Sequence, residues 1–218
     1  METQGSSNEL RVDLKVIADL VDNDARILDL GCGEGELLDY LIHQKNANGF
    51  GVEISDDGVR ACIERGVPVY QGDIDQGLSD HPANSFDFVI LSHTLQATMR
   101  PQYVVQEMLR VGKRIIISFP NFGYWSMRLN LLTHGRMPQT KLLPHSWYDT
   151  PNIHHCTILD FRDLCQEMNI TIVRFLPLAS TGMEPHNVIK RKLVKRLPPK
   201  GLANLVAPVA VFLLEKRN

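Results

Sequence analysis

Glycines and an acid alternate through residues 27–38 in a pattern that suits recognition of a small polar ligand. A short apolar run carries Asp29, and glycines then occupy every second position at Gly31, Gly33 and Gly35. Glycine lets the backbone approach a ligand where a Cβ atom would collide. The apolar helical pattern that follows places free N–H groups at the start of a helix. We therefore expect a ligand to lie over this turn.

The spacing of the glycines distinguishes between two kinds of nucleotide ligand. A turn that binds pyrophosphate has the pattern G-x-G-x-x-G, which this segment lacks. The carboxylate of Asp29 would also repel a pyrophosphate, whereas it suits a ligand with an amino group and no phosphate. The sequence thus disfavours an NAD-dependent oxidoreductase. Cys32 is interpreted as a small filler between the glycines, because nothing nearby in sequence lowers its pKa.

Two further acids follow the next predicted strands. Glu53 ends a strand 22 residues after Gly31, the spacing of an acid that accepts hydrogen bonds from ribose hydroxyls. Asp73 follows a short strand, where it could accept a hydrogen bond from an exocyclic amine while Ile74 covers a purine face. An acid at that position also suits a turn or a helix cap.

Two histidines are candidates for acid–base chemistry. His93 follows Ser92 at the end of the strand predicted over 86–91 and should face the same crevice, where an imidazole titrates near neutrality. A polar residue that only packs beside the ligand is the alternative. His154 is expected to line an acceptor pocket. No metal site is expected, because neighbouring residues such as His154 and His155 rarely form a tetrahedral set.

The segment 120–156 is predicted to be an irregular insert, since it is rich in proline, histidine and aromatic residues. Its aromatic side chains could form a lid over an acceptor, or a hydrophobic surface for a partner, or they could simply pack: Phe122, Tyr124, Trp125, Trp147 and Tyr148. A basic loop is predicted over 178–204. Its charged run at 190–196 suits a solvated face or a docking patch for an acidic partner.

Strands and helices alternate along the chain, so that the residues above would meet at one edge of a sheet. This order predicts an α/β fold with right-handed crossovers and helices on both faces of a mostly parallel sheet. Ligands of such sheets bind at the carboxyl ends of the strands. Helices are predicted over 9–22, 35–45 and 56–65, from Pro101 to Gly112, and over 157–169. Strands are predicted over 26–30, 50–53, 67–70, 86–91, 115–119, 170–176 and 205–214.

Length and composition agree with one α/β domain over residues 1–218. Charged residues make up 22% of the chain and the net charge is −2, which disfavours a nucleic-acid partner. Four scattered cysteines argue against a disulfide framework. The first residues lack the apolar region of a signal peptide, and no apolar stretch is long enough for a membrane span. We therefore expect a cytoplasmic protein without membrane contact.

The segment 29–35, together with Glu53 and Asp73, resembles the S-adenosylmethionine site of class I methyltransferases. The resemblance implies a Rossmann-like fold whose seven-stranded, mostly parallel sheet has an antiparallel last strand. It places the glycines under the amino-acid part of the cofactor, Asp29 near its amine, Glu53 at the ribose and Asp73 at the adenine amine. The cofactor would be S-adenosylmethionine or S-adenosylhomocysteine. The predicted contact residues are Asp29, Gly31, Cys32, Gly33, Gly35, Glu53, Ile54, Asp73, Ile74 and Ser92.

Longer motifs resemble the methionine biosynthesis protein MetW family. They cover Arg26 to Gly35, Gly51 to Ile54, Gln71 to Asp75, Leu91 to Gln96, Ser118 to Phe122 and Trp147 to His154. The resemblance implies association with a homoserine O-acyltransferase subunit. Two functions stay open: a methyltransferase acting on an unknown small molecule, with His93 or His154 as base, or an accessory protein that senses the cofactor. Acyl transfer by the chain itself is not expected, because the sequence contains no recognisable set of nucleophile, histidine and acid.

Overall fold

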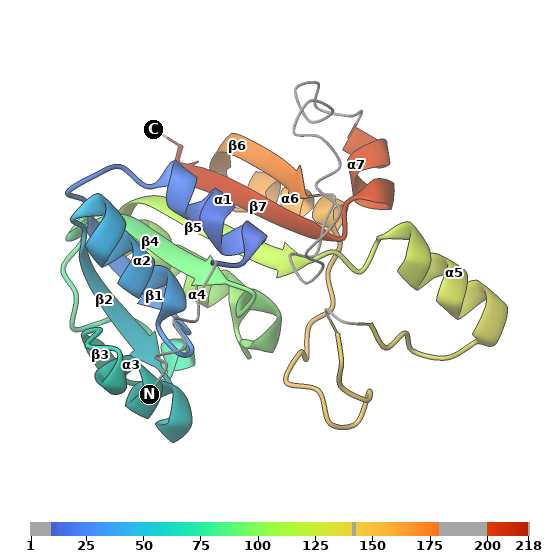
Figure 1. Ribbon diagram of the computed structural model, residues 1–218. Helices are drawn as coiled ribbons and strands as arrows, with labels where there is room; N and C mark the ends of the chain where they lie inside the picture. Colours follow the sequence, from blue (N-terminus) through green and yellow to red (C-terminus); the bar gives the residue numbers. More distant parts are fainter. Residues whose placement is uncertain (1–9, 141–142, 179–199, 218) are drawn as a thin grey trace, which may run out of the picture.

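A seven-stranded sheet forms the centre of the computed structural model, which describes residues 10–140, 143–178 and 200–217 (Figure 1). The strand order is β3-β2-β1-β4-β5-β7-β6, and β7 runs antiparallel to both of its neighbours while the other pairs are parallel. The predicted α/β class and the antiparallel last strand are confirmed. The strands are β1 (Arg26–Leu30), β2 (Asn48–Glu53), β3 (Val69–Gln71), β4 (Phe86–Ser92), β5 (Gly112–Pro120), β6 (Ile170–Leu178) and β7 (Val209–Lys216).

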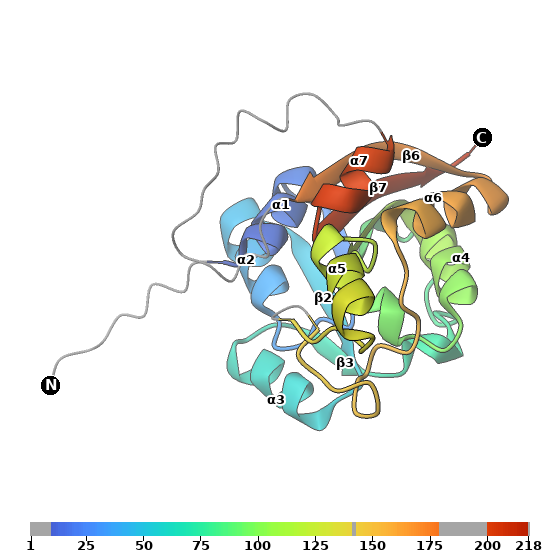
Figure 2. The same ribbon diagram turned by 90° about the vertical axis from the view of Figure 1, so that its right-hand side faces the viewer.

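Helices cover both faces of the sheet, and two views at right angles separate the layers (Figures 1 and 2). One apolar cluster joins α1 and α2 to one face through Ile27, and the other joins α4 and α6 to the opposite face through Leu28. Neighbouring residues of a strand point to opposite faces. The helices are α1 (Val12–Leu20), α2 (Glu36–Lys45), α3 (Asp56–Glu64), α4 (Pro101–Val111), α5 (Trp125–His134), α6 (Ile158–Glu167) and α7 (Lys200–Val206), with single 3₁₀ turns η1 (Ile74–Gln76) and η2 (Leu95–Ala97).

The predicted helix starts are confirmed by their local chemistry. The Ser55 side chain accepts a hydrogen bond from the Gly58 N–H at the start of α3. Pro101 occupies the first turn of α4, where its missing N–H costs nothing. Thr157 and Asp160 form a reciprocal capping box at α6, which satisfies two N–H groups that the helix leaves free.

Two expectations about irregular segments were wrong in part. The insert 120–156 contains α5, whose apolar residues lie on two opposite faces of the helix and so do not form the single apolar stripe of a helix packed on a core. The last strand was expected from residue 205, but residues 200–206 form α7 and the strand begins at Val209. Pro208 separates the two, because proline disfavours helix in the residue before it. The basic run 190–196 lies outside the described residues.

No helix within the described ranges is both long and apolar enough to cross a bilayer.

Asn121, which is fully buried, fastens the start of the insert to the rest of the fold. Its Nδ2 donates to the carbonyls of Asn204 and Ala207, at 2.8 and 2.7 Å. Its Oδ1 accepts from the N–H groups of Gly123 and Ile158, at 2.9 and 3.2 Å. One side chain thus satisfies backbone groups from the insert, α6 and α7.

Replacing Asn121 by Ala should lower the free energy of unfolding by about 3 kcal/mol, because buried carbonyl and N–H groups lose their partners. Chemical denaturation measures this change. Asn130→Ala on α5 is the matched control, and it should leave stability within about 0.5 kcal/mol of the original. Equal stability of the two variants would contradict the role given to Asn121.

Candidate functional site

Two adjoining cavities open at the carboxyl ends of β1, β2 and β4. The larger, of about 710 Å³, is lined by Asp29, the glycine turn and the start of α1. The smaller, of about 180 Å³, is lined by residues that follow β2 and β3. Gly31 lines both cavities. Apart from Gly35, all the predicted contact residues line one or the other, so the structure brings them into one crevice.

Asp29 is a buried acid in the middle of the site, with only 2% of its surface exposed. Its Oδ1 atom is buried and has no hydrogen-bond partner among the residues that the structure describes. Burial raises the pKa of Asp29 to about 8, and the negative charge of Glu53 adds to the effect. A buried polar atom without a partner is costly. A cationic donor in the cavity would therefore relieve that cost, and an amino group is such a donor.

The three glycines of the turn all have positive φ angles, of +66°, +56° and +76° in chain order, but their surroundings differ. A Cβ atom on Gly31 would lie 2.6 Å from Thr94 Oγ1, and one on Gly35 would lie 2.9 Å from Cys62 Sγ. A Cβ atom on Gly33 would meet no atom of the described part of the chain within 4 Å. Gly31 and Gly35 are thus required for packing, whereas Gly33 borders open space in the cavity.

Glu53 holds the glycine turn against the end of β2. Its Oε2 accepts a hydrogen bond from the Gly33 N–H at 2.9 Å, and its Oε1 accepts from Ile54 and Ser55 at 3.0 and 2.9 Å. Sequence spacing gave no sign of this scaffolding role. Carboxylate oxygens accept more than one hydrogen bond each, so these contacts are compatible with the ribose role, which stays a prediction.

Asp73 acts as a helix cap, the alternative role that its position in the sequence suggested. Its Oδ1 accepts from the Asp75 N–H at 2.9 Å and caps η1. The residue also lines the smaller cavity together with Ile54 and Ile74. The cap and the predicted adenine contact can coexist, because a carboxylate has two oxygens.

Cys32 lies against a second thiol rather than against an activating group. Its Sγ atom is 3.8 Å from Cys62 Sγ. Burial raises the pKa of the Cys32 thiol far above its usual range, and the charge of Asp29 adds to this. A thiol that stays protonated is a poor nucleophile. These contacts favour the interpretation of Cys32 as a filler.

His93 lines the larger cavity beside Ser92 and pairs with a residue that the sequence did not single out. Its Nε2 lies 3.2 Å from Oδ2 of Asp13, which is 2% exposed on α1. His93 has a φ of +58°, and such backbone strain clusters at functional sites.

Asp13 is held from its other side by Arg11, with Nε and Nη2 at 3.2 and 2.8 Å. Burial alone would raise the pKa of Asp13, but His93 and Arg11 outweigh it and keep this pKa well below its usual range. One signal could have identified this residue: Asp13 lies four positions before Ile17 and therefore on the apolar face of its helix.

His154 lies apart from His93. It lines a separate hollow of about 150 Å³ that shares no residue with the two cavities of the crevice. Its N–H donates to the Gln96 carbonyl at 2.9 Å, and its neighbour His155 stacks on Phe122 with ring centres 4.8 Å apart. Within the described ranges, no group of three His, Cys, Asp or Glu residues is arranged to hold a metal ion.

Comparison with known families and proteins points in one direction. Residues 11–213 match the family described as methionine biosynthesis protein MetW. The bifunctional methionine biosynthesis protein MetXA/MetW of Rhodopirellula baltica is 38% identical over 172 residues, which cover 75% of this chain and 28% of that protein. The chain therefore spans less than a third of that relative's length.

Solved structures with the same fold share little sequence with the chain. An S-adenosylmethionine-dependent methyltransferase from Thermotoga maritima is 18% identical with a TM-score of 0.65, covering 94% of this chain and 87% of its own. The cyclase SpnF is 16% identical with a TM-score of 0.61, covering 93% and 80%. These likenesses show the class I methyltransferase fold. The cyclase illustrates that this fold does not fix the reaction.

Proposed function

Because the chain belongs to the methionine biosynthesis protein MetW family, we propose that it acts in methionine biosynthesis with a homoserine O-acyltransferase and binds S-adenosylmethionine in the crevice. The observation that carries the cofactor assignment is the buried, unpartnered Oδ1 of Asp29. An amino-acid moiety with a free amine offers the donor that this atom lacks. S-adenosylhomocysteine has the same amine and should bind to the same site.

The residues that line the crevice suit the parts of this cofactor. Asp29 would hold the amine, and the open face of Gly33 would admit the amino-acid part. Glu53 would accept from the ribose hydroxyls, while Asp73 and Ile74 would meet the adenine ring in the smaller cavity. Cys32, Ile54 and Ser92 complete the walls.

The acyltransferase partnership is supported by the relative from Rhodopirellula baltica, whose name joins MetXA and MetW in one protein. As an accessory protein, the chain would use the cofactor to sense the end product of the pathway. A physical link between crevice and insert exists in Gln96, which follows His93 on the same loop. Its carbonyl accepts from the N–H groups of Ile153 and His154, and its Nε2 donates to the Pro120 carbonyl at 3.0 Å.

A methyltransferase that acts on an unknown small molecule is the second candidate. The pairing of His93 with Asp13 favours it, because a carboxylate orients an imidazole and stabilises its protonated form. When bound, S-adenosylmethionine supplies an electrophilic methyl group. His93 would take the proton of the acceptor, the nearby Asp13 carboxylate would stabilise the imidazolium that results, and the fold would contribute positioning.

Isothermal titration with S-adenosylmethionine, S-adenosylhomocysteine and NAD tests the crevice assignment. We expect the two adenosyl ligands to bind and NAD not to bind, because the glycine turn lacks the G-x-G-x-x-G spacing of a pyrophosphate site. Binding of NAD alone would overturn the assignment. The partnership is tested separately, by measuring homoserine O-acyltransferase activity with and without this chain. Unchanged activity together with no physical association would refute that part of the proposal.

A further inference from the structure

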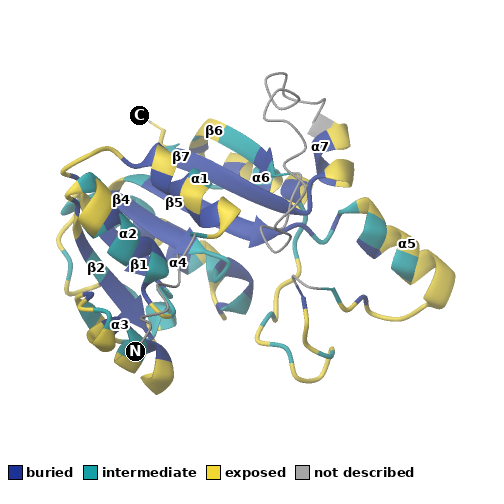
Figure 3. Cartoon of the chain, viewed as in Figure 1, coloured by how far each residue is buried: buried dark blue, intermediate teal, exposed yellow. Residues whose placement is uncertain are grey.

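Helix α5 and the loop after it stand away from the sheet. Figure 1 shows α5 at the margin of the molecule, and Figure 2, viewed from that side, shows it in front of the sheet, with residues 135–140 and 143–156 below it. Met127 is the buried residue of α5. Figure 3 shows that the outer part of this insert is largely exposed. The insert therefore contributes little to the core that the sheet and the other helices form.

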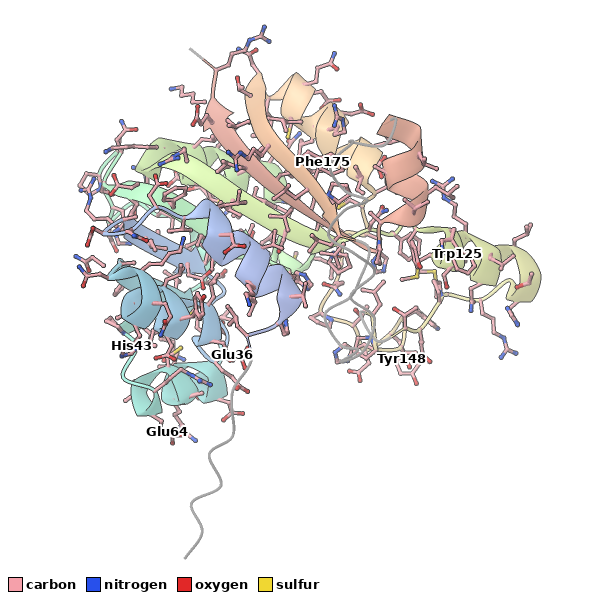
Figure 4. All side chains as sticks on the ribbon, turned by 45° about the horizontal axis from the view of Figure 1, so that its top comes forward. Glu36, His43, Glu64, Trp125, Tyr148 and Phe175 are labelled. Atoms are coloured by element: carbon pink, nitrogen blue, oxygen red, sulfur yellow. The ribbon has the colours of Figure 1, made fainter. Side chains whose placement is uncertain are left out.

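Large apolar side chains gather on this exposed insert. The most exposed are Leu132, Trp147 and Tyr148, at 83%, 74% and 76% of their surface. Trp125 and Tyr148 lie at the same end of the molecule (Figure 4). Both tryptophans of the chain, Trp125 and Trp147, are among the exposed side chains of the insert, although tryptophan is highly buried on average. We call this surface the insert face and define it by Trp125, Leu129, Leu132, Met137, Trp147 and Tyr148.

Met137, Trp147 and Tyr148 line one hollow of about 530 Å³. Exposed apolar surface marks interaction sites, and Trp, Tyr and Met are enriched at protein interfaces. The insert of residues 120–156 is also long enough to supply the roughly 20–30 residues that one side of a standard interface needs. These features indicate a protein partner rather than a small ligand.

We propose that the insert face is the docking surface for the homoserine O-acyltransferase, an inference that rests on the partnership proposed above. The relative from Rhodopirellula baltica supports this occupant, because most of that protein lies outside the part that this chain matches and its name includes MetXA. Fusion keeps two units at high effective concentration, which favours a contact between the matching unit and the rest of that protein.

Charge defines the partner further. Within the insert, Arg128, Arg136 and Lys141 are basic and Asp149 is the one acid, although the whole chain has a net charge of −2. The insert is therefore more basic than the rest of the chain. Complementary charge steers association and excludes wrong partners. The docking surface of the acyltransferase should accordingly be apolar with an acidic rim, and binding should weaken as salt concentration rises.

The test measures binding of purified homoserine O-acyltransferase from the same organism by biolayer interferometry. Leu132→Asp and Trp147→Ala should each weaken binding tenfold or more, since large side chains at interface centres dominate affinity. Ile63→Asp is the matched control, because Ile63 is also helical and 65% exposed but lies on α3. All three variants should keep the thermal midpoint and the S-adenosylhomocysteine affinity of the original protein.

Each outcome has a distinct meaning. Weaker binding in the two insert variants alone supports the proposal. Equal binding by all variants overturns the docking surface but leaves the acyltransferase partnership in place. No binding by the original protein overturns the partnership and the docking surface together, while the cofactor assignment is judged by its own titration. Self-association that Leu132→Asp abolishes would show that a second copy of this chain is the occupant instead.

Discussion

Replacing Asp29 by Asn should weaken S-adenosylmethionine binding about 10- to 150-fold at pH 8. A hydrogen bond to a charged group contributes about 1.5–3 kcal/mol, and the buried Asp29 carboxylate is the acceptor that we assign to the amine of the ligand. The variant should also be more stable without ligand, because a buried amide is not charged. Opposite changes in affinity and stability would mark Asp29 as a residue retained for binding.

The pH dependence follows from the raised pKa of Asp29. In the unfolded chain an Asp ionises near pH 4, whereas in the folded protein this one ionises near pH 8. Between these values the unfolded state has lost the proton that the folded state keeps, so stability falls as pH rises. The Asp29→Asn substitution removes this slope and should raise the free energy of unfolding at pH 8 by on the order of 5 kcal/mol.

Binding is linked to the same proton. An amine prefers the ionised carboxylate, so binding at pH 7 should release a proton, and affinity should rise by up to about tenfold per pH unit between pH 6 and pH 8. Titration calorimetry in two buffers with different ionisation enthalpies measures that release. The Asp29→Asn variant should show none from this site. Asp57→Asn, whose carboxylate is fully exposed, is the control and should behave like the original protein.

Local sequence patterns were sufficient for the elements around the crevice. The predicted strand over 26–30 has the same bounds as β1, because an apolar run closed by glycine has few alternatives. The contacts within the crevice were not predictable in the same way. Glu53 at the end of β2 accepts a hydrogen bond from Gly33 in the turn after β1. Such a bond depends on the placement of the two strands side by side, which local patterns do not reveal.

The insert and the pairing of His93 show two other limits. The apolar residues of α5 lie on two opposite faces, so the single apolar stripe that reveals a helix packed on a core is missing there. The pairing of Asp13 was not predicted although its helix was. A pattern of apolar positions shows which face of a helix is buried, but it does not show which residue an acid on that face will contact. His93 supplies the answer from a loop 80 residues later.

Replacing Gly33 by Ala should abolish most ligand binding at a small cost in stability. The added methyl group would stand in the open cavity, where nothing lies within 4 Å, and would occupy the space assigned to the amino-acid part of the cofactor. We expect at least a roughly 30-fold loss of S-adenosylmethionine affinity, the equivalent of about 2 kcal/mol. The positive φ of +56° costs an alanine roughly 1–2 kcal/mol, which leaves most of the fold's stability intact.

Gly66→Ala is the control that separates strain from occlusion. Gly66 also has a positive φ, of +75°, with nothing within 4 Å of its Cβ position, but it follows α3 and lines neither cavity of the crevice. Both variants should therefore lose similar stability, and only Gly33→Ala should lose binding. Gly31→Ala should be the least stable of the three, because its methyl group would collide with Thr94. Retained affinity in Gly33→Ala would mean that the ligand does not pass over the turn.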